Sequence, residues 1–257
     1  MPFTFAHPAA VVPLRRLRFL QTIPLIVGSM MPDVPYFLPP SLGKALPETH
    51  TLYGSLVTCL PLGMAFLVAV LLLREPLTVL LSSNARWLCV RSIERFEGRP
   101  MRWPIALLSV LIGTWTHIAW DSFTHSGGWT AQRVWVLNMS VSLFGLWEVQ
   151  ICHLLQYIST IFGLLVLIMW LRRQLAEAPG ASRDFGRGAA RWGLLAGIGL
   201  AAVAVGVFQA VMLWDSASWY RLGFLLSTRI VGWFILMYLA AGLFVTLNRG
   251  SVPEPTG

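Results

Sequence analysis

The stretch "WPIALLSVLIGTWTHIAWDSFTHSGGW", residues 103–129, decides how this chain folds. Its first part, residues 103–120, contains no Asp, Glu, Lys or Arg. At about 1.5 Å per residue, a helix of that length nearly crosses a hydrocarbon core about 30 Å thick. The run then ends in His117, Asp121 and His125. Ionisable groups at membrane depth are costly and usually functional, so the stretch predicts a spanning helix with a polar site at its end.

The whole composition agrees with a membrane protein. Apolar residues make up 56% of the 257 residues and charged residues 12%, against about 25% in soluble domains. The mean hydropathy is +0.68. We expect an all-α, polytopic helical bundle that forms a single membrane domain over residues 1–257. Its five predicted spanning helices cover residues 51–73, 103–120, 154–171, 192–214 and 230–248.

The N-terminal segment predicts an additional helical hairpin. In residues 7–33, "HPAAVVPLRRLRFLQTIPLIVGSMMPD", two short apolar stretches flank Arg15, Arg16 and Arg18. The arginines follow the first apolar stretch, which is not the order of a signal peptide. Two short helices with an arginine turn would return His7 and Asp33 to one level. The alternative is a single tilted span beginning near residue 19, which would leave His7 on the other side.

The arginines between the apolar runs indicate the orientation. They cluster in residues 74–102 and 172–191, which the positive-inside bias places in the cytoplasm. The net charge of +8 is therefore a topology signal, and we expect no nucleic-acid partner. The C-terminus would be cytoplasmic, with residues 251–257 a disordered tail. The aromatic residues 126–147 would lie at the outer interface, near the polar ends of the helices.

A metal site is the first interpretation of the polar residues. His117 and Asp121 are four residues apart and so share a helical face, with His125 close to it. Imidazole nitrogens and carboxylate oxygens are ligands of zinc. The alternative is a hydrogen-bonded pair inside the bundle. No histidine follows His153, so residues 1–153 are the predicted metal-site half and residues 154–250 the scaffold helices.

Three segments carry a family resemblance. "MPFTFAHPA", "GSMMPDVPYF" and "HIAWDSFTHSGGW" resemble an uncharacterised bacterial membrane family, domain of unknown function 4184. That family is distantly similar to inner-membrane metal-dependent hydrolases and to the ligand order of zinc-dependent phospholipase C. The resemblance implies a multi-pass protein of the bacterial inner (cytoplasmic) membrane. The implied metal ligands are His7, Asp33, His50, His117 and Asp121, with His125 a further candidate.

The chain departs from the hydrolase-like pattern in two places. It has Val34, Pro35 and Tyr36 after the Pro-Asp pair, where those relatives often have acidic residues. It also lacks a second His-x-x-x-Glu motif. The sequence therefore favours one or two metal ions over a larger polynuclear centre.

Two classes of function follow from these residues. The first is a metal-dependent hydrolase at the outer membrane–water interface, acting on a lipid or a lipid-linked phosphoester, with zinc or else manganese. Asp33 and Asp121 would be its catalytic carboxylates, while Arg133, Arg221 and Arg229 would hold an anionic head group or else anchor the protein at the interface. The second is a transporter or a structural membrane protein, in which the same cluster relays ions or protons, or packs helices.

Overall fold

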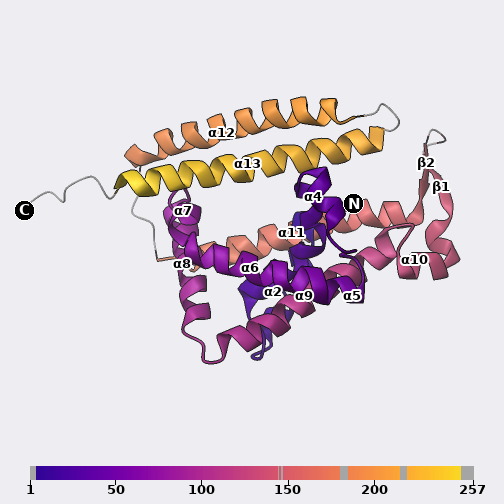
Figure 1. The fold of residues 1–257 in the computed structure, drawn as a ribbon, viewed down its shortest axis with the longest axis horizontal. Helices are drawn as coiled ribbons and strands as arrows, with labels where there is room; N and C mark the ends of the chain where they lie inside the picture. Colours follow the sequence, from indigo (N-terminus) through magenta and orange to yellow (C-terminus); the bar gives the residue numbers. More distant parts are fainter. Residues whose placement is uncertain (1–3, 144, 146, 180–184, 215–218, 250–257) are drawn as a thin grey trace, which may run out of the picture. The chain divides into compact units, whose positions relative to one another are not determined.

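Long helices dominate the chain, as the sequence predicts (Figure 1). The structure, a computed structural model, describes residues 4–143, 145, 147–179, 185–214 and 219–249. By length and composition, five helical stretches within these residues are able to cross a membrane: Leu52–Leu72, Arg102–Arg133, Ile151–Ala176, Gly188–Met212 and Arg221–Asn248. Each overlaps one predicted span, so the all-α, multi-pass prediction is confirmed. The predicted tail, residues 251–257, lies outside the described residues.

Two compact units divide the chain. The first comprises residues 1–68 and 94–176, and the second comprises residues 69–93 and 177–257. A single membrane domain over residues 1–257 stays a prediction. The first unit contains η1 (Thr4–Ala6), α1 (Pro8–Val11), η2 (Leu14–Arg16), α2 (Thr22–Met30), η3 (Met31–Asp33), α3 (Val34–Phe37), α4 (Pro40–Ala45), α5 (Leu52–Gly54), η4 (Ser55–Cys59), most of α6 (Leu60–Leu72), α9 (Arg102–Thr124), α10 (Trp129–Arg133), η5 (Trp135–Asn138), β1 (Ser140–Leu143), β2 (Trp147–Gln150) and α11 (Ile151–Ala176).

The N-terminal hairpin is present. Helices α1 and α2 contact each other, and the arginine-rich turn connects them. Arg99 fastens this turn by donating hydrogen bonds of 3.2 Å to the carbonyls of Arg18 and Leu20. Leu20 also packs with Val11 and Leu25 in a small apolar core. The alternative of one tilted span is therefore wrong, because the chain reverses direction between the two short helices.

Helices α2 and α9 pack closely against each other in the first unit. A Cβ on Gly28 would lie 2.1 Å from the backbone oxygen of Val110, and one on Gly113 would lie 2.3 Å from that of Leu25. The hydroxyl of Thr114 donates a 3.1 Å hydrogen bond to the carbonyl of Gly28. Helices in lipid associate through such small residues and polar contacts, because lipid supplies no hydrophobic drive between them. The crossing therefore depends on the two glycines.

A tight turn fixes the position of the loop that precedes α5. Thr51 accepts a 2.9 Å hydrogen bond from the backbone N–H of Gly54, and so caps α5. A Cβ on Gly54 would lie only 1.6 Å from the carbonyl oxygen of Glu48. The π-helical turn η4 follows, and its Ser55 accepts a 3.0 Å hydrogen bond from the indole of Trp115 on α9. The loop before α5 is thus held against α9.

Residues 126–147 contain more regular structure than the sequence predicts. Strands β1 and β2 form an antiparallel hairpin in which Ser140 pairs with Gln150. Gly145, at φ +67°, occupies the left-handed conformation that the turn requires and that a Cβ would disfavour. Trp129 and Trp135 are 66% and 73% exposed, as expected of residues that meet lipid head groups. The interfacial position of this segment stays a prediction.

The second unit pairs two long helices. It contains α7 (Arg74–Thr78), most of α8 (Ser83–Glu97), α12 (Phe185–Met212) and α13 (Trp219–Arg249). The indole of Trp233 on α13 donates a 2.9 Å hydrogen bond to Gln209 on α12. The hydroxyl of Tyr238 donates another, also 2.9 Å, to the carbonyl of Leu77 at α7. These contacts fix α13 between its two neighbours.

Substitution of the crossing glycines tests this account of the fold. We expect Gly28→Ala and Gly113→Ala each to destabilise the protein by about 1–3 kcal/mol, because the added Cβ meets backbone that cannot rotate away. Gly197→Ala is the matched control, since its Cβ meets nothing within 4 Å and alanine favours a helix. Thermal melting in detergent measures the effect. Equal melting midpoints for the three variants and the wild type would contradict it.

Candidate metal centre

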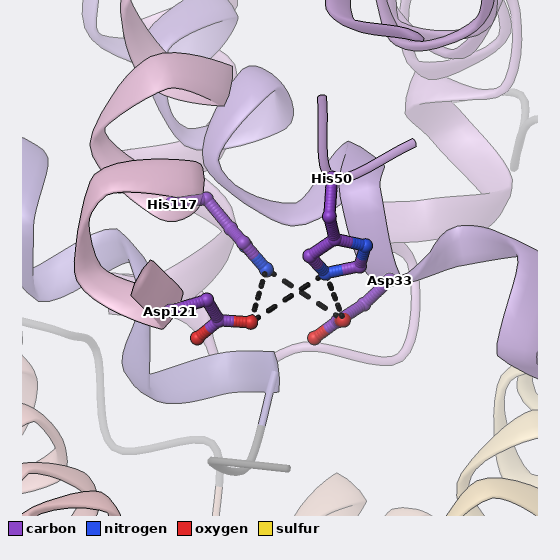
Figure 2. Close-up of side chains that lie close together, drawn as sticks. All are labelled: Asp33, His50, His117 and Asp121. Atoms are coloured by element: carbon purple, nitrogen blue, oxygen red, sulfur yellow. Dashed lines mark ion pairs between the residues drawn. The ribbon is translucent and has the colours of Figure 1, made fainter. Parts of the chain in front are cut away.

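Four side chains from three segments converge in the first unit (Figure 2). Asp33 comes from η3, His50 from the loop before α5, and His117 and Asp121 from α9. One donor atom of each residue lies within 4.8 Å of the donor atoms of the other three. The spacing of four along α9 puts His117 and Asp121 one turn apart on its buried face. The structure therefore brings together four of the six predicted ligands.

The distances between the donor atoms match a metal site better than a hydrogen-bonded cluster. The Nε2 atom of His117 lies 3.3 Å from Asp121 Oδ2 and 3.6 Å from Asp33 Oδ1. The Nε2 atom of His50 lies 3.5 Å from each of the same two oxygens. Nitrogen–oxygen hydrogen bonds are shorter, about 2.7–3.2 Å. Ligands about 2.1 Å from a tetrahedral zinc ion are about 3.4 Å apart, which is close to these four nitrogen–oxygen distances.

His117 is held in the tautomer that a metal requires. Its Nδ1 lies 2.7 Å from the carbonyl oxygen of Ser29, which only accepts hydrogen bonds, so Nδ1 carries the proton. In the neutral ring Nε2 then keeps its lone pair. This Nε2 is buried and has no hydrogen-bond partner among the residues that the structure describes. Histidines that bind metals commonly donate their other N–H to a backbone carbonyl in this way.

His50 is oriented by the hydroxyl of Thr49, which takes part in two hydrogen bonds. The hydroxyl of Thr49 donates a 2.7 Å hydrogen bond to the carbonyl of Pro32, so its proton is already used. It lies 3.2 Å from His50 Nδ1 and therefore accepts from that nitrogen. The Nε2 atom of neutral His50 is left with its lone pair, facing Asp33 and Asp121.

Asp33 is positioned by a buried hydroxyl. Thr4 donates a 2.7 Å hydrogen bond to Asp33 Oδ2. The other oxygen, Oδ1, is buried and has no hydrogen-bond partner in the described part of the chain. The hydrogen bond therefore divides the carboxylate into an oxygen bonded to the protein and an oxygen that is available to a cation.

The electrostatics of the site favour a positive charge. Burial lowers the pKa of His50, but the carboxylates of Asp121 and Asp33 outweigh it and raise the pKa to about 9. Burial also raises the pKa of Asp33, yet the neighbouring His117 and His50 hold it well below its ordinary value. Without an ion, the positive charge of protons on the neighbouring histidines balances the negative charge of the two carboxylates. A divalent cation would displace those protons.

The two remaining predicted ligands, His7 and His125, lie beside the four-residue group. The ring of His7 stacks on that of His117, with centroids 3.7 Å apart. Its Nε2 lies 3.5 Å from Asp121 Oδ1, the oxygen that does not face the group. The Nδ1 atom of His125 lies 3.6 Å from the same oxygen. Burial and the nearby His117 lower the pKa of His7 to about 4, so His7 is neutral at neutral pH.

A cleft of about 490 Å³ leads to the donor atoms. Its lining includes Asp33, His50, Asp121 and His125, together with Tyr36, Glu48 and Trp129. Among the four grouped donors, only His50 has a side chain with appreciable exposure, 22%, against 8% or less for the others. The site is therefore open to solvent on the His50 side and closed elsewhere.

The predicted arginines fall into different parts of the chain. Arg133 lies beside the cleft, where its guanidinium stacks 4.1 Å above the ring of Trp129. Arg221 and Arg229 are on α13 in the second unit, so their role toward the site stays a prediction. Sequence reasoning missed Thr4, Ser29 and Thr49, since no spacing or residue type marks a single hydroxyl or carbonyl as a positioning group.

The fold and this cluster define a class, a multi-pass helical membrane protein with a buried group of two histidines and two aspartates able to hold a metal ion. More narrowly, the chain belongs to the family of the domain of unknown function DUF4184, whose sequence profile matches residues 1–246. The resemblance of the three quoted segments to this family is thereby confirmed. No curated protein and no solved structure matches the chain.

Loss of the positioning hydroxyls should weaken metal binding. We expect Thr49→Val and Thr4→Val each to lower zinc affinity about 10- to 100-fold, because His50 and Asp33 lose the groups that orient them. Thr116→Val is the matched control, since within the described residues its hydroxyl bonds only to the carbonyl of Gly113 in its own helix. Competition with a zinc-chelating dye gives the affinities. Unchanged affinity in both test variants would contradict the proposed positioning.

Metal affinity should also depend on pH. His50 has a pKa of about 9 without an ion, so at lower pH a metal must displace its proton. We expect the affinity to rise about tenfold per pH unit for each displaced proton below that pKa, and to level off above it. Titration in zinc buffers at several pH values measures this slope, and proton release into weak buffer confirms it. An affinity that is constant between about pH 6.5 and 8.5 would refute the assignment of His50 as a ligand.

Proposed function

We propose that this protein is a metal-dependent hydrolase that acts at the membrane–water interface, on a lipid or a lipid-linked phosphoester. The observation that carries the proposal is the cluster of Asp33, His50, His117 and Asp121, with donor distances of 3.3–3.6 Å between each imidazole and both carboxylates. Both imidazoles are held through Nδ1, which leaves each Nε2 for a cation.

Zinc is the first choice of metal and manganese the second. Two imidazole nitrogens and two carboxylate oxygens at this spacing form a donor set that suits tetrahedral zinc. Manganese favours more oxygen ligands and six-fold coordination, which the cleft would have to complete with water. When bound, such an ion would lower the pKa of a water molecule and polarise a phosphoryl oxygen.

The residues around the proposed ion would have different roles. Asp33, His117 and Asp121 are almost fully buried and would fix the ion in place. His50 lies on the cleft side, where water and substrate have access. In this proposal Asp33 and Asp121 are the catalytic carboxylates. The Oδ1 atom of Asp121 has no hydrogen-bond partner among the described residues and faces His7 and His125, away from the proposed ion.

The surroundings of the cleft support a membrane lipid as the substrate. Trp129 lines the cleft and is 66% exposed, which suits the head-group region of a bilayer. Arg133, stacked on that ring, would hold an anionic head group, and Arg221 and Arg229 remain candidates for the same task. The arginine-rich loops favour a cytoplasmic C-terminus in a bacterial inner membrane, with the cleft outside.

A purely structural role explains the cluster less well. A network that only tied helices together would place donors and acceptors within about 3.2 Å. Here the imidazole–carboxylate distances are longer, and His117 Nε2 and Asp33 Oδ1 are buried with no hydrogen-bond partner in the described residues. Unpaired buried polar atoms are costly, so a bound cation accounts for them better than helix packing does.

The proposal is tested by metal content and turnover. We expect the purified wild type to contain zinc and to hydrolyse at least one member of a panel of phosphodiesters and phospholipids. His117→Ala should lose zinc and lower turnover about 100-fold or more, because a bound metal ion supplies several kcal/mol of transition-state stabilisation. His153→Ala, a histidine outside the cluster, is the matched control. Equal turnover by wild type and His117→Ala would refute a metal-dependent hydrolase.

A further inference from the structure

A tryptophan and an arginine meet where the turn of the N-terminal hairpin contacts α11. Helix α11 packs closely against η1 and α1, since a Cβ on Gly163 would lie 3.0 Å from the carbonyl oxygen of Ala6. Trp170 follows Gly163 by seven residues, about two helical turns, and so lies on the same face of α11. Its ring meets Arg15 of η2, whose guanidinium carbon lies 5.6 Å from the ring centroid. This contact joins α11 to the arginine-rich turn of the hairpin.

The Arg15–Trp170 pair has hydrogen-bond donors that the protein does not use. Arg15 Nε and Trp170 Nε1 are both buried, and neither has a hydrogen-bond partner among the described residues. Stacking on the indole holds the guanidinium in place but supplies no oxygen to either N–H group. Unpaired buried N–H groups are destabilising, so these two donors indicate an acceptor from outside the described part of the chain.

The charge around the pair is positive. Arg16, next to Arg15 on η2, is exposed, and so are Arg172 and Arg173, which follow Trp170 on α11. Residues 8–22 and 151–173, the two segments that contain these arginines, have no Asp or Glu. The acceptor that suits these surroundings is therefore an anion. Guanidinium groups bind phosphate oxygens through charge-assisted, often bidentate hydrogen bonds.

The adjoining surface of α11 favours a lipid as the source of the phosphate. The helix is long and apolar enough to cross a membrane, and Trp170 lies at the end of its apolar run. Beside it, on the neighbouring face of the helix, Phe162, Leu165 and Met169 are 61%, 53% and 56% exposed. Acyl chains would cover this face while the phosphate reaches the arginines. Basic pockets between membrane helices bind anionic head groups in this manner.

We propose that an anionic phospholipid binds where η2 meets the end of α11, with its phosphate held by Arg15 and Trp170. A phosphate diester has two free oxygens, so it is able to accept from the guanidinium and from the indole N–H at once. A rotation of the half-buried Arg15 side chain would bring both donors to it. The neighbouring arginines would disfavour a head group that carries an ammonium. The lipid would tie the hairpin to α11, independently of the metal centre, whose residues it does not contact.

Lipid-dependent melting of the full chain tests this site. The protein, freed of lipid in a neutral detergent, is titrated with phosphatidylglycerol, with phosphatidylcholine of the same acyl chains, or with inorganic phosphate. We expect only phosphatidylglycerol to raise the melting midpoint, because a ligand that binds the folded state stabilises it. Arg15→Gln and Trp170→Phe should each need roughly tenfold more of this lipid for the same shift, since each loses a donor to a charged group.

The matched control is Arg91→Gln. Arg91 also stacks on a tryptophan, 4.6 Å from the ring of Trp87, but in the second unit, so this variant should respond as the wild type does. Trp170→Phe keeps a stacking ring and loses only the indole N–H, so it reports on the site even where Arg15→Gln is unstable.

Four outcomes would overturn the proposal. No shift with phosphatidylglycerol would show that this lipid does not bind. Equal shifts with phosphatidylglycerol and phosphatidylcholine would show general solvation by lipid. The same shift with inorganic phosphate would identify a soluble anion as the ligand. An undiminished response in both Arg15→Gln and Trp170→Phe would place the lipid elsewhere on the protein.

Discussion

The close crossing of α2 and α9 is the contact on which the rest of the first unit depends. Gly28 and Gly113 each leave no room for a side chain between the two backbones. This approach brings the carbonyl of Ser29 within 2.7 Å of His117 Nδ1. Small residues are the usual means of joining two helices in lipid, and here the same packing also sets the tautomer of a histidine in the candidate metal centre. The α2–α9 crossing therefore both holds the first unit together and orients His117.

The cluster is organised before any ion is present, and this has an energetic consequence. Hydrogen bonds through Thr4, Thr49 and Ser29 place one atom of each of three side chains against the protein and leave the other facing the centre. Such preorganisation lowers the conformational cost of binding. It also concentrates two carboxylates in a buried space, where they need a positive charge nearby. Protons supply that charge without metal, so a metal and protons compete for the same atoms.

The sequence predicts the spans and the donors for different reasons. Hydropathy and arginine distribution are local properties, so the five spans and the N-terminal hairpin can be predicted from them. The pairing of His117 with Asp121 follows from helical spacing alone. Which histidines lie together depends on how distant segments cross in the fold. The sequence could therefore not predict that His50 joins the four-residue group while His7 lies beside it. The β-hairpin was missed because its short strands lie in an aromatic segment that hydropathy marks only as interfacial.

The one accessible donor differs from the others in how the chain supports it. Asp33 and the two candidate ligands on α9 lie on helical turns, whereas His50 lies in a loop fixed by the tight turn at Gly54 and by the hydroxyl of Thr49. A loop residue at the mouth of a cleft can adjust its position more readily than a residue on a packed helix. Exchange of metal, water and substrate would therefore take place on the His50 side, while the helices keep the remaining ligands in place. This asymmetry is what a reactive centre needs, since a centre closed on every side could hold an ion but could admit no substrate.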